Sequence, residues 1–137
     1  MDVTPKILTI DDAEFVQHLY RVSFRKIGGC TLHHAYNGME ALNCLDREGP
    51  MDLIILDLNM PIMDGLQFLA EFKKRPDYRA THVLVSSTED QDGLIRQALE
   101  NGAQSFIKKP FTLEQFVELL GKVLASLPKR PQATPIP

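Results

Sequence analysis

Cysteine is scarce in this sequence, and the features of a zinc site or a redox pair are missing. Only two cysteines are present, Cys30 and Cys44, and neither belongs to a CxxC pair or a Cys/His cluster. A structural zinc site and a redox motif are therefore disfavoured. We expect two reduced thiols that are packed in the protein.

Excess charge and long apolar runs are also missing. The formal net charge is only -3, which argues against direct binding to nucleic acid or to an anionic membrane. No apolar run reaches the roughly 18 residues that a transmembrane helix requires. The first residues, MDVTPK, lack the basic and apolar regions of a signal peptide. We therefore expect a cytoplasmic protein whose partner is another protein or a small phosphate donor.

The chain has the size of one ordinary domain. Its 137 residues are 44% hydrophobic, which is enough for a sizeable core. Beyond Leu127 the sequence reads PKRPQATPIP, with four prolines in ten residues and no apolar periodicity. We therefore expect one domain over residues 1–127, followed by a flexible tail or linker stub over 128–137.

Short β-branched runs alternate with helical patterns along the whole chain. The runs that predict strands are Lys6–Ile10, Thr31–Ala35, Asp52–Asp57, His82–Ser86 and Ser105–Ile107. The patterns that predict helices are Phe15, Leu19 and Val22; residues 39–48; Leu66, Leu69 and Phe72, ending near Pro76; Leu94, Ile95 and Ala98; and a stripe from Leu113 to Leu127. Gly28-Gly29 and Gly49-Pro50 predict the ends of the first two helices, and Thr112 with Gln115 predicts a capping box at the start of the last. This alternation predicts an α/β fold, with a doubly wound parallel sheet of five strands covered on both faces by five helices.

Polar side chains gather where the predicted strands end, which is the edge at which open α/β sheets bind ligands. The first strand is followed by Asp11-Asp12, the third ends in Asp57, the fourth leads into Ser86-Ser87-Thr88, and the fifth leads into Lys108-Lys109-Pro110. Taken singly, each set is more typical of a turn, a helix cap or a solvated surface. Their convergence on one edge favours a functional site.

Three neighbouring carboxylates repel one another unless a cation is present. Oxygen ligands in a crowded anionic pocket favour Mg²⁺, with Mn²⁺ as the alternative ion. A carboxylate can also act as a nucleophile and form an aspartyl phosphate, while a lysine and a hydroxyl stabilise the transferring group. The histidines His18, His33, His34 and His82 show no ligand spacing, and we interpret them as surface or partly packed residues.

The same residues resemble the receiver domains of two-component response regulators, in particular those of the chemotaxis-regulator type. The resemblance spans about residues 6–125. It is carried by Asp11-Asp12, by AYNGMEAL at Ala35–Leu42, by DLIILDLNMPIMDG at Asp52–Gly65 and by KKPF at Lys108–Phe111. It implies a flavodoxin-like sheet with strand order 2-1-3-4-5. It also implies a signalling phosphoacceptor with self-catalysed phosphotransfer and autodephosphorylation, rather than an ordinary enzyme.

The resemblance implies a role for each site residue. Asp57 would accept the phosphoryl group from a histidine kinase or a histidine phosphotransfer protein. Asp12, Asp57 and the backbone carbonyl of Asn59 would bind the metal directly, and Asp11 would act mainly through water. Ser87 and Lys109 would hold the phosphoryl group, and the Lys109–Pro110 bond would be cis.

The resemblance also implies a switch, in which Ser87 moves toward the phosphate while Phe106 turns inward. The surface of the fourth helix, fifth strand and fifth helix would bind a downstream protein, and the chain would be a monomer or a phosphorylation-linked homodimer. Two departures from the family pattern bear on rates and on the switch. Thr88 stands where alanine or glycine is usual, and Phe106 replaces the commoner tyrosine. Asn59 and Glu89 occupy positions that tune dephosphorylation.

Two other functions compete with this interpretation. A phosphatase of the haloacid-dehalogenase type also uses an aspartate after a hydrophobic strand, a lysine and Mg²⁺. However, that family places its nucleophile on the first strand and a second acid two residues later, where this chain has Asn59. A degenerate receiver that serves only as a binding module would have no need to keep Asp57, both acids and Lys109.

Overall fold

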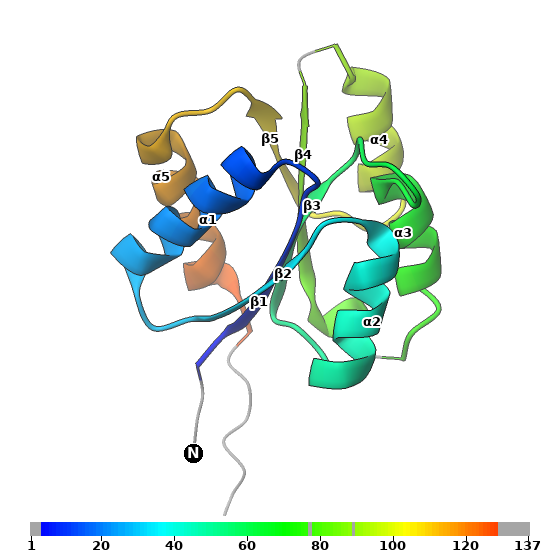
Figure 1. The fold of residues 1–137 in the computed structure, drawn as a ribbon, viewed down its shortest axis with the longest axis horizontal. Coiled ribbons are helices and arrows are strands. Elements are labelled where there is room, and N and C mark those ends of the chain that lie inside the picture. Colours follow the sequence, from blue (N-terminus) through cyan, green and yellow to red (C-terminus); the bar gives the residue numbers. More distant parts are fainter. Residues whose placement is uncertain (1–3, 77, 89, 129–137) are drawn as a thin grey trace, which may run out of the picture.

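The computed structural model describes residues 4–76, 78–88 and 90–128. Within these ranges, five parallel strands form one sheet in the order β2-β1-β3-β4-β5, as predicted (Figure 1). The strands are β1 (Lys6–Ile10), β2 (Thr31–Ala35), β3 (Leu53–Asp57), β4 (His82–Thr88) and β5 (Ser105–Lys109). The predicted α/β fold is therefore confirmed.

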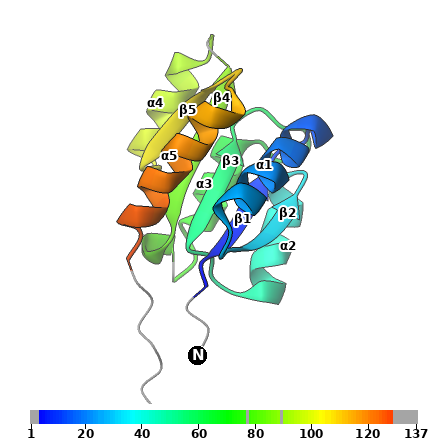
Figure 2. The same ribbon diagram turned by 90° about the vertical axis from the view of Figure 1, so that its left-hand side faces the viewer.

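Helices cover both faces of the sheet. They are α1 (Glu14–Ile27), α2 (Gly38–Glu48), α3 (Gly65–Phe72), α4 (Asp92–Glu100) and α5 (Leu113–Ser126), with a short 3₁₀ turn, η1 (Tyr78–Ala80), before β4. α1 and α5 lie side by side on one face, and α2, α3 and α4 cover the other (Figures 1 and 2). In the part of the chain that the structure describes, no helix is both long and apolar enough to span a bilayer.

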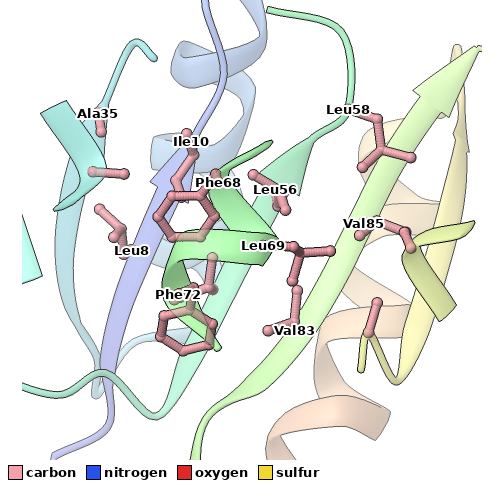
Figure 3. Close-up of a cluster of buried hydrophobic side chains, with 14 of the residues drawn as sticks. Leu8, Ile10, Ala35, Leu56, Leu58, Phe68, Leu69, Phe72, Val83 and Val85 are labelled. Atoms are coloured by element: carbon pink, nitrogen blue, oxygen red, sulfur yellow. The ribbon is translucent and has the colours of Figure 1, made fainter. Parts of the chain in front are cut away.

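The central strand β3 is buried along its whole length. Its alternate side chains enter two separate cores, as expected for a strand covered on both faces. Leu56 packs with Phe68 and Phe72 of α3 (Figure 3), while Ile55 packs with the α1 and α5 side. The strand begins at Leu53 rather than at the predicted Asp52, although the Asp52 N–H still donates to the Lys6 carbonyl at 2.8 Å and the Asp52 carboxylate accepts from the Lys6 N–H at 2.7 Å.

Local signals set most of the helix ends as predicted. Gly28 and Gly49 end α1 and α2 with positive φ angles of 72° and 83°, a conformation that glycine adopts without a steric penalty. Thr112 begins α5 with the predicted capping box to Gln115. α3 ends earlier than predicted, at Phe72, because hydrogen-bonded turns that involve residues 73–75 follow it.

The buried face of α1 differs from the stripe that predicted the helix. Phe15, the first residue of that stripe, is 79% exposed. The buried residues of α1 are Gln17, Tyr20, Ser23 and Phe24. Two of them are strongly polar, so the apolar periodicity predicts the helix but not which of its faces is buried. The tail predicted for 128–137 lies, apart from Pro128, outside the described residues.

Candidate functional site

Three carboxylates meet at the carboxyl end of the sheet, on its upper edge in Figure 1. Asp11 and Asp12 follow β1, and Asp57 is the last residue of β3. Each offers a carboxylate oxygen, and these oxygens all lie within 4.8 Å of one another. Asp11 and Asp57 are buried, whereas Asp12 is exposed. The convergence predicted from the strand ends is therefore present.

Backbone groups hold the two buried acids in place. Asp11 Oδ1 accepts a hydrogen bond from the Ala13 N–H at 3.0 Å, and Asp57 Oδ1 accepts one from the Asn59 N–H at 3.1 Å. In both cases the carboxylate binds the backbone two residues later, which is the geometry of an Asx turn. The turns after β1 and β3 therefore fix the orientation of the acids that precede them.

A buried glutamine fastens the loop that carries Asp11 and Asp12. Gln17 Nε2 lies 3.0 Å from the carbonyl oxygen of Asp11 and 2.9 Å from that of Ala35, so it ties the end of β1 to the end of β2. Gln17 Oε1 in turn accepts a hydrogen bond from Thr9 Oγ1 at 2.7 Å, and His34 Nδ1 lies 3.0 Å from the same oxygen. His34 is thus a partly packed histidine, as interpreted from the sequence.

Lys109 supplies the positive charge of the site. Its Nζ lies 2.8 Å from Asp11 Oδ2 and 3.4 Å from Asp57 Oδ1. The lysine side chain is only 18% exposed, so solvent screens these ion pairs far less than it screens surface ion pairs. The Lys109–Pro110 bond is cis, as expected.

Asp57 is electrostatically the most perturbed acid of the site. Burial raises the pKa of Asp57 from its ordinary value of 3.8 to about 7, and the charge of Asp11 pushes it in the same direction. Lys109 and the Asn59 N–H oppose this rise but do not cancel it. In the absence of a divalent ion, the site is therefore short of positive charge.

The donor set fits a hard divalent cation. All three acids offer oxygen atoms, which Mg²⁺ prefers over nitrogen or sulfur ligands. The exposed Asp12 leaves the site open to solvent, and the raised pKa of Asp57 shows that additional positive charge would be stabilised there. Among the described residues, this group of acids is the only cluster of three or more His, Cys, Asp or Glu residues with metal-binding spacing.

β4 and β5 carry Ser87 and Lys109 at the same edge of the sheet, and both strands are longer than predicted. β4 continues to Thr88 and β5 to Lys109, and these two residues are partners in the parallel pairing. Ser86 pairs with Asp57 across β3 and β4. Ser87 is 1% exposed and its hydroxyl donates to Gln91 Oε1. Thr88 is exposed and its hydroxyl donates to Asp90 Oδ1 at 2.6 Å.

The loop after β3 presses closely against the acids. A Cβ atom on Gly65 would stand 2.6 Å from the carbonyl oxygen of Asp57 and 2.7 Å from Leu58 Cα, so only glycine fits at the start of α3. Ile62 has a φ angle of 70° and is 79% exposed. A β-branched residue is strained in this left-handed region. Asn59 is exposed in the same loop.

Other residues of the predicted site lie further out. Phe106 on β5 is 45% exposed, so its ring does not lie in the core. Glu89, which was expected to influence dephosphorylation, falls outside the described residues. Both cysteines are free thiols, with Cys44 buried and Cys30 partly buried, as predicted.

Sequence reasoning missed several polar residues around the acids. The Tyr20 side chain is fully buried beside Phe116 at a ring distance of 5.1 Å, and its hydroxyl lies 3.5 Å from Ser86 Oγ. Burial and the charge of Asp11 raise the pKa of Tyr20 well above its ordinary value. Gln17 and Gln91 were likewise not anticipated. A glutamine or tyrosine within a helical pattern carries no sequence signal for such long-range contacts.

A groove opens beside Lys109, between α1 and the turn after β5. Its lining residues are mostly apolar and comprise Phe15, Val16, Leu19, Thr88, Lys109, Pro110 and Phe111. The predicted stripe of α1 thus contributes Phe15 and Leu19 to this groove. These two apolar residues of α1 therefore lie beside Lys109 at the edge of the acidic site and not at the centre of the core.

Comparison with known proteins places this geometry in a family. The model of the response regulator receiver domain matches residues 7–121. The chain is 33% identical to the chemotaxis protein CheY of Listeria monocytogenes over 117 residues, which cover 85% of this chain and 96% of the relative. It is also 33% identical to CheY of Bacillus subtilis over 119 residues, 87% of this chain and 97% of the relative.

A solved structure agrees with these sequence relatives. The chemotaxis protein CheY4 of Vibrio cholerae superimposes with a TM-score of 0.78 at 28% identity, covering 88% of this chain and 98% of that protein. Receiver domains act as phosphoacceptors in two-component signalling and generally use Mg²⁺. With the family model matching most of its length, the chain belongs to the response regulator receiver domain family.

Proposed function

We propose that this chain takes a phosphoryl group onto Asp57 from a histidine kinase or a histidine phosphotransfer protein, in a Mg²⁺-dependent reaction. The observation that carries the proposal is the cluster of three carboxylates within 4.8 Å, with Lys109 Nζ reaching both Asp11 and Asp57. Asp57 is 4% exposed and ends the central strand β3. Its carboxylate oxygen would attack phosphorus as the bond from phosphorus to the donor breaks.

The remaining site residues would position the reacting groups and neutralise charge. Lys109 would follow the incoming phosphoryl group, because the additional negative charge would draw its Nζ away from Asp11. The Ser87 hydroxyl would donate a hydrogen bond to a phosphoryl oxygen. Thr88, whose hydroxyl is held by Asp90, stands at the rim where the donor would enter and would narrow that access.

Mg²⁺ would be held by Asp12, Asp57 and the backbone carbonyl of Asn59, with Asp11 acting through water. When bound, the ion supplies positive charge that offsets both the crowded acids and the phosphoryl oxygens. Asp11 is already engaged by Lys109 at 2.8 Å and by the Ala13 N–H. Lys109 lies closer to Asp11 than to Asp57, from which its Nζ is 3.4 Å away, and this closer ion pair supports an indirect role for Asp11 in metal binding.

Signalling would use the surface of α4, β5 and α5 to bind a downstream protein, with the chain acting as a cytoplasmic monomer or a phosphorylation-linked homodimer. Phe106 lies on this surface and is 45% exposed, which leaves it free to turn inward when Ser87 binds the phosphoryl group. We place the receiver domain at residues 1–127 and a flexible tail at 128–137. Autodephosphorylation would return the surface to its resting form.

The test is incubation with acetyl phosphate and Mg²⁺, followed by intact mass measurement. We expect one phosphoryl group per chain in an acid-stable, alkali-labile adduct that is lost in Asp57→Asn and in the presence of EDTA. Asp46→Asn is the matched control, because Asp46 is an exposed aspartate of α2 that pairs with Arg75 at 2.8 Å. That variant should be labelled as fully as the natural chain.

The alternative functions give different results in the same experiment. Rapid multiple turnover of small phosphate esters would indicate a phosphatase of the haloacid-dehalogenase type. The absence of any adduct, together with no affinity for Mg²⁺ or Mn²⁺, would indicate a pure binding module. Either outcome would refute the proposed phosphoacceptor role.

A further inference from the structure

The hydroxyl of Ser87 already has a hydrogen-bond partner that the proposed reaction does not use. It donates to Oε1 of Gln91, the residue that immediately precedes α4. The same oxygen lies 3.4 Å from the Thr88 N–H, so two donors from the end of β4 point at one acceptor. Ser87 is only 1% exposed, and water therefore competes little for this contact.

A serine hydroxyl carries a single hydrogen and can donate only one strong hydrogen bond at a time. The oxygens of a phosphoryl group are acceptors, and so is Oε1 of Gln91. Ser87 must therefore release Gln91 before it can donate to a phosphoryl oxygen on Asp57. The two interactions exclude each other.

We propose that Gln91 is a positioning residue that holds the Ser87 hydroxyl away from Asp57 in the resting protein and competes with the phosphoryl group for its hydrogen. This inference rests on the proposed function, because it requires Ser87 to bind the phosphoryl group. The hydrogen bond to Gln91 stabilises the resting state alone, so it lowers the apparent affinity of the site for a phosphoryl-like anion.

The location of Gln91 links this competition to α4. Its backbone N–H donates to Thr88 O at 3.1 Å, and its carbonyl accepts from the N–H groups of Leu94 and Ile95 at 3.0 and 3.1 Å. These backbone bonds do not involve the side-chain amide. Release of Ser87 therefore removes one of the two hydrogen bonds from the end of β4 to the Gln91 side chain and loosens the link to the first turn of α4, which belongs to the proposed partner surface.

The test uses beryllofluoride with saturating Mg²⁺ as the phosphoryl-like probe. Binding is measured by fluorine NMR of the bound beryllofluoride, on the natural chain and on each variant, so that Phe106, the proposed switch residue, stays unchanged. Gln91→Met removes the acceptor while keeping the length of the side chain. We expect it to bind beryllofluoride about fivefold more tightly, the effect of one ordinary hydrogen bond.

Two further variants make the test specific. Gln91→Glu keeps an acceptor and charges it, so it should bind the probe several-fold more weakly, because charge-assisted hydrogen bonds are stronger. Gln97→Met makes the same chemical change as Gln91→Met at an exposed position within α4 and should leave the affinity unchanged. Circular dichroism establishes that each variant is folded.

The decisive readout is a double-mutant cycle with Ser87→Ala. If Gln91 acts through the Ser87 hydroxyl, the gain from Gln91→Met disappears once that hydroxyl is removed. A gain that persists in the Ser87→Ala background would overturn the inference, and so would unchanged or weaker binding by folded Gln91→Met. Failure of the parent protein to bind beryllofluoride at all would instead refute the proposed function.

Discussion

Replacing Asp57 by asparagine should stabilise the metal-free protein at neutral and alkaline pH, although it abolishes the phosphoacceptor. The Asp57 residue is 4% exposed, and burial together with the charge of Asp11 raises its pKa from 3.8 to about 7. At about 1.4 kcal/mol per pKa unit, the ionised Asp57 lowers the free energy of unfolding by about 4 kcal/mol relative to a neutral side chain. Asparagine is close in shape and never ionises.

The sign of the pH dependence follows from the direction of this shift. Because the pKa of Asp57 is higher in the folded than in the unfolded protein, the folded state binds more protons between about pH 4 and pH 7. The natural protein should therefore lose stability relative to Asp57→Asn as the pH rises through this window. Above pH 7 the difference should be constant, and below pH 4 it should vanish.

Urea denaturation of both proteins in EDTA, at intervals from pH 4 to pH 9, measures this difference. We expect the advantage of Asp57→Asn to grow with pH and level off above neutrality. Mg²⁺ should then stabilise the natural protein much more than the variant, because binding to the folded state alone adds stability. Parallel stability curves for the two proteins across the whole pH range would refute the electrostatic account of the site.

Three further changes test other parts of the structure. Lys109→Met should lower the free energy of unfolding by about 3 kcal/mol at pH 8, because it leaves Asp11 and Asp57 without their cation. Urea denaturation should show a smaller loss of stability at pH 5, where Asp57 is protonated. Gly65→Ala should lower the free energy of unfolding by about 2 kcal/mol, because the added Cβ clashes with the Asp57 carbonyl. Gly121→Ala is the control in α5, where an added Cβ has no neighbour within 4 Å, and it should raise the free energy of unfolding by about 0.5–1 kcal/mol in the same assay. Ile62→Gly should keep or raise the thermal midpoint, because relief of the φ angle of 70° offsets the flexibility that glycine adds to the unfolded chain; a midpoint several degrees lower would contradict the assigned strain.

The sequence predicted the fold well because the signals that define it are local. Among the described residues, alternating β-branched runs and helical patterns identified the strands and α-helices in their correct order but not the short η1, and Gly28 and Thr112 marked helix ends where the structure has them. Strand ends were less accurate. β4 and β5 each run two residues beyond the predicted Ser86 and Ile107, because pairing between neighbouring strands, rather than residue type, decides where a strand stops.

The candidate site was predicted only as far as its residues follow strands. Asp57 and Lys109 could be found because parallel strands bring their carboxyl ends to one edge. Gln17, Tyr20 and Gln91 could not, because each lies in or beside a helix and owes its role to contacts with other elements. The apolar stripe that predicted α1 pointed away from its buried face, where the hydrogen bonds of Gln17 and the apolar packing of Tyr20 and Phe24 together specify the contact.

The amide of Gln17 restricts how this domain can evolve. One fully buried side chain binds the carbonyl groups of Asp11 and Ala35 and also accepts from Thr9. A hydrocarbon at position 17 would remove the amide donor from both carbonyl groups in a place that water does not reach, although the Ala35 carbonyl would keep the Asp11 N–H at 3.1 Å. Substitutions at Thr9, Gln17 and His34 are therefore expected to survive as coordinated exchanges, so the interior of the first two strands and the acid-bearing loop must diverge together.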